Sequence, residues 1–109
     1  MPAAIGKLES LDELYLSYNE LETLPDEIKK LQDLEKLHLR DNKLKKLPKS
    51  MEKLRKLELL DLRNNELKDL PYEIKELFLR MQSLYLSGNE MLESGINKET
   101  LGRKELRVI

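Results

Sequence analysis

The sequence predicts an α/β repeat fold, a short solenoid with a parallel β-sheet on its concave side and short 3-10 or helical turns on its convex side. Two features support this prediction. Leucine occupies 26 of the 109 positions, at a spacing that fits neither a helical heptad nor simple strand alternation. Asparagine recurs at intervals of 23, 23 and 24 residues, at Asn19, Asn42, Asn65 and Asn89. A fixed period of this length indicates a repeat architecture.

Alignment on these asparagines gives a unit of the form LxxLxLxxNxLxxLPxxIxxLxx, within a single domain of residues 1–109. Three successive copies match this pattern along their whole length, which is too regular to be a coincidence. The predicted divisions are a partial repeat at 1–10, full repeats at 11–33, 34–56 and 57–80, a degenerate last repeat at 81–96 and a C-terminal cap at 97–109.

Each unit contains a predicted strand at its LxL pair, because leucines alternate there with mostly polar residues. Both leucines of a pair are expected to point inward, while the residues between and beside them face outward. The pairs are Leu14/Leu16, Leu37/Leu39, Leu60/Leu62 and Leu84/Leu86. The asparagine that follows turns the chain, and stacked Asn amides are expected to satisfy backbone groups that the turn would leave unpaired.

A proline begins the return segment of each full unit, where its missing N–H and restricted φ favour a first helical turn or an extended run. These residues are Pro25, Pro48 and Pro71. The apolar residues that follow lie on one side of a short turn, at Ile28/Leu31, Met51/Leu54 and Ile74/Leu77. One unit cannot bury these side chains alone, so stacking of the units is expected to produce one continuous core.

With this pattern the chain resembles the leucine-rich repeat family, in the 23-residue LPxxIxxL subclass known from intracellular Ras-pathway scaffolds and plant intracellular Ras-group proteins. The resemblance covers nearly the whole chain and is specific for the fold. It implies a protein-interaction module. It says little about the partner, because one solenoid fold serves many unrelated tasks.

The two ends depart from the repeat. Residues 1–8 read as the second half of a unit with Met1 in place of its first leucine. This beginning fits either a fragment of a longer solenoid or a natural start with a weak cap. Near the other end, Asn97 or Thr100 is placed to begin a terminal helix within the predicted C-terminal cap.

The segment before the last repeat, Leu77–Met81, holds one residue more than its counterparts in the earlier units. We expect Phe78 to fill a bulged turn on the convex side. The alternative is that Phe78 and Leu79 form an exposed contact there.

Composition excludes several classes of function. The chain has 20 Lys and Arg against 21 Asp and Glu, no Cys and one His. This balance argues against binding to nucleic acid or to an anionic membrane. Because the chain has no Cys and a single His, it cannot form a Cys-based or multi-His metal site. No known catalytic or cofactor motif occurs, so we expect neither enzyme activity nor a cofactor. The convex lysines alternate with acidic residues, which favours a solvated face over a phosphate track.

Strands stacked in register place equivalent residues of successive units about 4.8 Å apart, in columns along the concave face. Tyr and Arg, which are enriched at binding hot spots, fall in these columns. The predicted partner-binding residues are Tyr15, Tyr18, His38, Arg40, Leu59, Asp61, Arg63 and Tyr85. Arg40 and Arg63 are neighbours, which suits an acidic group or a phosphate on the partner unless nearby aspartates neutralise them. Aromatic residues also favour strands without any binding role.

These patterns predict a non-enzymatic module that binds a protein or peptide partner, as a signalling scaffold or regulator. The absence of Cys fits an intracellular, cytoplasmic location, because extracellular members of the family usually close their ends with disulfides. Two alternatives stay open: a targeting segment of a larger enzyme, such as a deadenylase, kinase, phosphatase or GTPase, or a secreted effector of a parasite or pathogen. The sequence leaves the oligomeric state open.

Overall fold

The structure, a computed structural model, describes residues 3–68, 74, 77–78, 80–89 and 107–108. Several sequence predictions therefore lie outside the described residues. They concern the return turn at Pro71, the side chain of Leu79, and almost all of the cap at 97–109.

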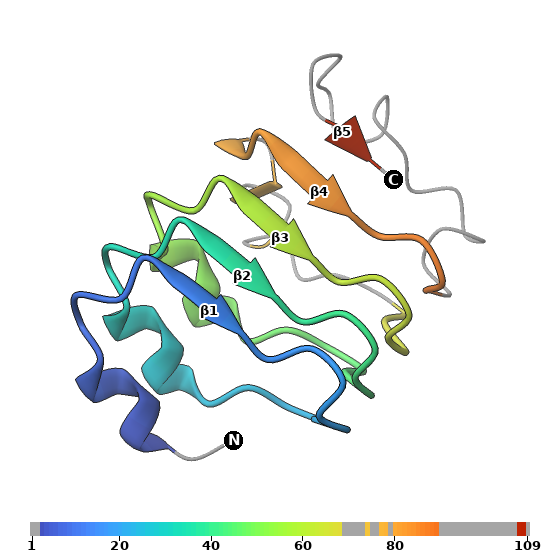
Figure 1. The fold of residues 1–109 in the computed structure, drawn as a ribbon, viewed down its shortest axis with the longest axis horizontal. Coiled ribbons are helices and arrows are strands. Elements are labelled where there is room, and N and C mark those ends of the chain that lie inside the picture. The colour runs from blue at the N-terminus through green and yellow to red at the C-terminus, as the bar shows by residue number, and fades with distance from the viewer. Residues whose placement is uncertain (1–2, 69–73, 75–76, 79, 90–106, 109) are drawn as a thin grey trace.

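One parallel sheet forms the front of the molecule, and its strands follow one another in chain order (Figure 1). The strands are β1 (Glu13–Tyr15), β2 (Lys36–His38), β3 (Leu59–Asp61), β4 (Ser83–Tyr85) and β5 (Arg107–Val108). Each strand pairs in parallel with the next. The connections from β1 to β2 and from β2 to β3 pass behind the sheet. This is the predicted solenoid.

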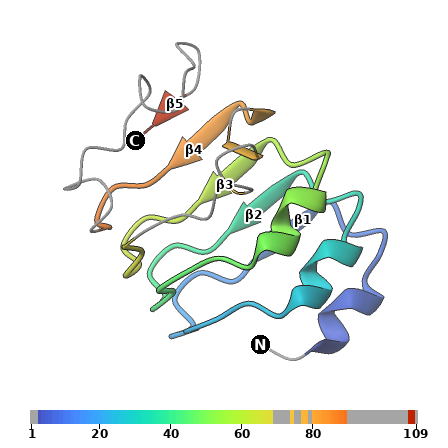
Figure 2. The ribbon, with the colours of Figure 1, turned by 180° about the vertical axis from the view of Figure 1, so that it is seen from behind.

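Short 3-10 helices cover the back of the sheet (Figure 2). They are η1 (Ala3–Lys7), η2 (Asp26–Lys30) and η3 (Lys49–Lys53). In the third full unit Ile74, Leu77, Phe78 and Arg80 are helical. The sheet face and the helical face are thus the concave and convex sides that the sequence predicts.

Proline sets the start of η2 and η3. Pro25 and Pro48 precede these helices with φ of −73° and −69° and an extended ψ. The carbonyls of these two prolines then accept hydrogen bonds from the N–H groups of Ile28 and Met51, at 3.1 Å each. Proline is suited to this position because the beginning of a helix leaves its N–H groups without intrahelical partners. Ile28 and Met51 are fully buried, as their spacing predicts.

The repeated asparagines form a buried hydrogen-bond ladder at the ends of the strands. Asn65 Nδ2 donates to the carbonyl of Leu39 in the preceding unit at 2.9 Å and to that of Leu62 in its own unit at 3.0 Å. Its Oδ1 accepts from the N–H of Leu44 at 3.1 Å. Asn42 and Asn89 repeat this pattern and are equally buried. The predicted role of the asparagines is confirmed.

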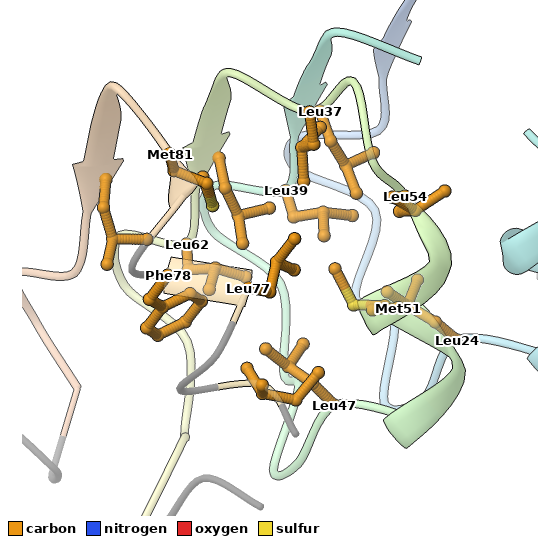
Figure 3. Close-up of a cluster of buried hydrophobic side chains, with 14 of the residues drawn as sticks. Leu24, Leu37, Leu39, Leu47, Met51, Leu54, Leu62, Leu77, Phe78 and Met81 are labelled. Atoms are coloured by element: carbon orange, nitrogen blue, oxygen red, sulfur yellow. The ribbon is translucent and has the colours of Figure 1, made fainter. Parts of the chain in front are cut away.

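The core is one continuous cluster of apolar side chains, mostly leucines, between the sheet and the helices (Figure 3). Leu37 in β2 and Leu39 just after it are fully buried. Their counterparts in the next two units are equally buried. In the first unit Leu14 and Leu16 also face the core but are only partly buried, because β1 is the edge strand of the sheet. Both leucines of each pair therefore point inward, and burial is complete only between two neighbouring units.

Phe78 is fully buried beside Leu62 and Leu77 (Figure 3). The extra volume of the one-residue insertion is thus filled by an aromatic side chain inside the core. This confirms the predicted role of Phe78. It contradicts the alternative in which Phe78 forms an exposed contact on the convex side.

Residues 107–108, within the predicted C-terminal cap, form a strand. These residues form β5, with Arg107 opposite Ser83 and Val108 opposite Leu84. The exposed edge of β4 offers unpaired N–H and C=O groups, which a strand satisfies and a helix does not. The sheet therefore extends by one strand at the end of the predicted cap, and the helix expected to begin at Asn97 or Thr100 lies outside the described residues.

Candidate partner-binding surface

The parallel register places five of the eight predicted site residues in two columns on the concave face. The first column consists of Glu13, Lys36, Leu59 and Ser83. The second consists of Tyr15, His38, Asp61 and Tyr85. Beyond the second column, the N–H of Leu16 donates to the carbonyl of His38 at 2.8 Å, so the pairing continues past the strand. The predicted columns are confirmed as a spatial arrangement.

Tyr15, His38 and Glu13 form a compact cluster on β1 and β2. The rings of Tyr15 and His38 are stacked, with centroids 4.3 Å apart and planes inclined by 2°. The Tyr15 hydroxyl donates to Glu13 Oε1 at 2.6 Å, and His38 Nε2 lies 3.1 Å from the same oxygen. Tyr15 is nevertheless 68% exposed, so most of its surface is free for a partner.

These hydrogen bonds determine how the cluster ionises. The bond from the Tyr15 hydroxyl, followed by that from His38, lowers the pKa of Glu13 below its ordinary value of 4.5. The same bond raises the pKa of Tyr15 above 10.0, because the hydroxyl proton is held by a carboxylate. The Glu13 carboxyl therefore stays ionised at neutral pH, next to the Tyr15 ring.

Arg63 makes the tightest ion pair of the surface, with Asp61. Arg63 Nε donates to Asp61 Oδ1 at 2.9 Å and Nη2 donates to Oδ2 at 2.7 Å. The guanidinium carbon lies 4.9 Å from the centre of the Tyr85 ring, in a cation–π arrangement. Asp61 is only 6% exposed, so this predicted contact residue faces Arg63 and not the solvent. Burial raises the pKa of Asp61, but hydrogen bonds from Arg63 outweigh it and the pKa falls below 3.8.

Arg40 is paired in a similar way, with Asp41 of its own turn. Its Nε donates to Asp41 Oδ2 at 2.9 Å, and both side chains are partly exposed. The two arginines are therefore each neutralised by an aspartate, as the sequence allowed. The idea of an unneutralised Arg40/Arg63 pair awaiting an acidic group does not hold in this arrangement.

A third column, at the turns after the strands, has a backbone conformation that the sequence reading missed. Tyr18, Asp41, Asn64 and Gly88 all have positive φ, between 57° and 81°. Asp, Asn and Gly tolerate this left-handed conformation, whereas a bulky residue rarely adopts it. Tyr18 is the exception, with φ of 62°, and it is 69% exposed.

Leu59, the remaining predicted contact, lies in the first column and is partly buried. Beside this column the surface is hollowed, with a volume of about 290 Å³. The lining residues are Asp12, Glu13, Glu35, Lys36 and Glu58. The sequence reading did not single out this acidic hollow. The signal was available, because Asp12, Glu35 and Glu58 occupy one position of successive units.

Another hollow lies at the turns that lead from the 3-10 helices into the strands. Its volume is about 810 Å³, and its lining residues are Glu9, Ser10, Lys29, Lys30, Gln32, Asp33, Lys53 and Arg55. Lys56 Nζ lies 2.9 Å from Asp33 Oδ1 at its border. This hollow contains none of the predicted site residues, and its lining holds four cationic residues and two acidic ones. It is therefore less suited to be the site than the ordered concave columns.

The part of the chain that the structure describes lacks both a metal-binding cluster and a membrane-spanning helix. It contains no group of three or more His, Cys, Asp or Glu side chains arranged to hold a metal ion. Among the same residues, no helix has the length and apolar character needed to cross a membrane.

The stacked units, the parallel concave sheet and the buried asparagine ladder define a repeat protein with a row of parallel strands on one face. Comparison with known families identifies it more closely. The chain matches the family described as leucine rich repeat over residues 2–44 and 32–91. It belongs to the leucine-rich repeat family, whose domains generally mediate protein–protein interactions and are typically non-enzymatic. Comparison with curated proteins gives no significant match.

Several solved structures are similar. A leucine-rich repeat protein of Leptospira interrogans is 39% identical, with a TM-score of 0.83 over 97% of this chain and 27% of that one. The ectodomain of the receptor kinase SOBIR1 from Arabidopsis thaliana is 32% identical, with a TM-score of 0.78 over 99% of this chain and 60% of that one.

A third similar structure is the plant peptide hormone receptor RGFR1 in complex with RGF2. It is 31% identical, with a TM-score of 0.72 over 82% of this chain and 15% of that one. The chain thus spans between 15% and 60% of the length of these three proteins.

Proposed function

We propose that the protein is a non-enzymatic interaction module that binds a protein or peptide on its concave face, as a scaffold or regulator of signalling. The observation that carries the proposal is the pair of highly exposed tyrosines, Tyr15 and Tyr18, on the face that also holds the Arg63–Tyr85 contact. Exposed aromatic and arginine side chains on a rigid sheet are typical of binding hot spots.

The backbone at Tyr18 supports the same surface. A bulky residue with φ of 62° costs of the order of 1–2 kcal/mol relative to an ordinary conformation. Asp41, Asn64 and Gly88 avoid this cost at the equivalent turns. Strained residues persist most often where they serve a function, and here the strained residue carries an aromatic ring that is largely exposed.

We further propose that the protein acts inside a cell and belongs to the 23-residue LPxxIxxL subclass. The unit length of 23 residues between Asn19, Asn42 and Asn65 supports the subclass. The absence of Cys supports the location, because disulfides are common in secreted domains.

The proposal is tested by selecting binders from a displayed peptide library and measuring them against two variants. Arg40→Ser/Leu59→Ser alters the concave face, and Lys45→Ser/Lys46→Ser alters exposed residues outside the concave columns. We expect the first variant to weaken the selected peptides at least about tenfold and the second to leave them unchanged. Equal binding to both variants, with both folded, would show that the concave face is not the site.

A recognition segment of a larger enzyme is the second candidate. The similarity to the ectodomain of a receptor kinase favours it, because there a repeat domain of this kind belongs to a protein with a kinase. The complete reading frame distinguishes the two, since only the second candidate requires an attached catalytic domain.

A further inference from the structure

The acidic hollow beside the first column carries an excess of negative charge. Four carboxylates and one ammonium line it. In the part of the chain that the structure describes, Asp12, Glu35 and Glu58 form no ion pair, in contrast to Asp33, Asp41 and Asp61 elsewhere. The hollow therefore holds carboxylates that a cationic partner can reach without displacing an existing ion pair.

The arginines of the concave face do not offer a matching site for an anion. Arg63 is bound at two atoms by the carboxylate of Asp61, and Arg40 is bound by Asp41. An acidic partner would have to compete with these aspartates. Charge complementarity thus favours a basic partner over an acidic one.

An aromatic ring stands next to the hollow. Glu13 lines the hollow and also accepts the hydrogen bond from the Tyr15 hydroxyl, so the ring and the carboxylates share one neighbourhood. One face of the Tyr15 ring is stacked on His38, and the residue is still mostly exposed. An exposed tyrosine ring beside carboxylates attracts an Arg or Lys side chain through both charge and cation–π interaction.

We propose that the acidic hollow and the Tyr15 ring together receive the Arg or Lys side chains of a basic peptide segment that lies across the concave face. This inference rests on the proposed function and names the chemistry of its partner. The volume of about 290 Å³ lies at the lower end of the range for ligand pockets, so it suits a side chain of a longer peptide better than a separate small molecule.

The test uses three labelled peptides that differ only in charge: Gly-Arg-Ser-Arg-Ser-Arg-Gly, and the same sequence with Gln or with Glu in place of each Arg. Fluorescence polarisation measures their binding to the full chain. We expect the Arg peptide to bind at least about tenfold more tightly than the Gln peptide, and less tightly as salt rises from about 50 to about 300 mM. Tight binding of the Glu peptide, or no binding of the Arg peptide at about 1 mM, would overturn the inference.

Two matched variants locate the binding. Glu35→Lys/Glu58→Lys reverses charges in the hollow, and Glu22→Lys/Glu66→Lys makes the same net change at exposed residues outside it. We expect the first to reduce binding of the Arg peptide at least about tenfold, and the second to reduce it no more than about threefold. Equal losses in the two variants would show a general charge effect and refute the assigned site.

The contribution of the ring is measured with Tyr15→Ala and Tyr15→Phe. We expect Ala to weaken the Arg peptide several-fold and Phe to restore most of the loss, since phenylalanine keeps the π face without the hydroxyl. Failure of this inference is distinct from failure of the proposed function. If library peptides of other charge depend on Arg40 and Leu59, the concave face binds a partner but the partner is not basic.

Discussion

Removal of the Asn65 side chain tests the buried ladder most directly. In Asn65→Ala, the N–H of Leu44 loses the acceptor Oδ1, which is its partner in the described part of the chain. The carbonyls of Leu39 and Leu62 each lose one bond, but each keeps another from Asn42 or Asn89. The substitution thus leaves one buried donor unsatisfied and two acceptors half satisfied, and it removes a longer contact of 3.4 Å to the carbonyl of Arg63.

The expected loss of stability follows from this count. An unsatisfied buried donor costs about 1–3 kcal/mol, and each of the two lost bonds to a carbonyl that keeps a second donor costs about 0.5 kcal/mol. We therefore expect Asn65→Ala to lower the free energy of unfolding by about 2–4 kcal/mol. Urea unfolding followed by circular dichroism measures this value, because the midpoint shifts while the slope stays constant.

Asn19→Ala is the matched control. Asn19 occupies the same position in the first unit but is exposed, and its Nδ2 donates only to Leu16 and Ser17 of its own unit. We expect this substitution to cost less than about 1 kcal/mol. Equal losses for the two variants would refute the reasoning, because the ladder between units would then contribute nothing beyond the local turn.

Three further predictions concern the turn column, the ion pair and the core. Gly88→Ala should lower stability by about 1–3 kcal/mol, because φ is 81° and the added Cβ would lie 2.2 Å from Asn64 Oδ1; Asn64→Gly should recover part of the loss in thermal unfolding. Asp61→Asn should destabilise the protein at neutral pH, and the difference should vanish on acidification. The pKa of Asp61 is lowered in the fold, so its stabilisation is complete above 3.8 and disappears as the pH falls through the lower folded value. Phe78→Ala should cost about 3–5 kcal/mol in urea unfolding, because it empties a fully buried position.

Each of these has a contradicting result. Gly88→Ala as stable as the parent protein would mean that the turn adapts without strain. A constant difference between Asp61→Asn and the parent protein down to about pH 2 would mean that Asp61 does not titrate with a lowered pKa. A loss below about 1 kcal/mol for Phe78→Ala would mean that the segment around the insertion is not packed as a core.

The sequence by itself determined the repeat architecture, because burial in a solenoid depends on position within one unit and that position recurs along the chain. Leu37, Leu60 and Leu84 could be placed in the core from spacing alone. The ladder of asparagines and the starts of η2 and η3 followed from the same regularity. The columns of the concave face were predictable for this reason, since register is inherited from the period.

The chemistry within the columns was decided only by the tertiary structure, because it depends on which side chains from neighbouring units meet. Asp61 could be read as a contact residue, yet its burial and its two bonds to Arg63 make it a support for that arginine. The stack of Tyr15 on His38 joins residues 23 positions apart. The left-handed backbone at Tyr18 could not be predicted, because a Tyr in the sequence does not indicate a positive φ. Periodicity specifies the path of the backbone. Hydrogen bonds and ion pairs between units depend instead on the directions of side chains from two units, which the pattern of one repeat does not give.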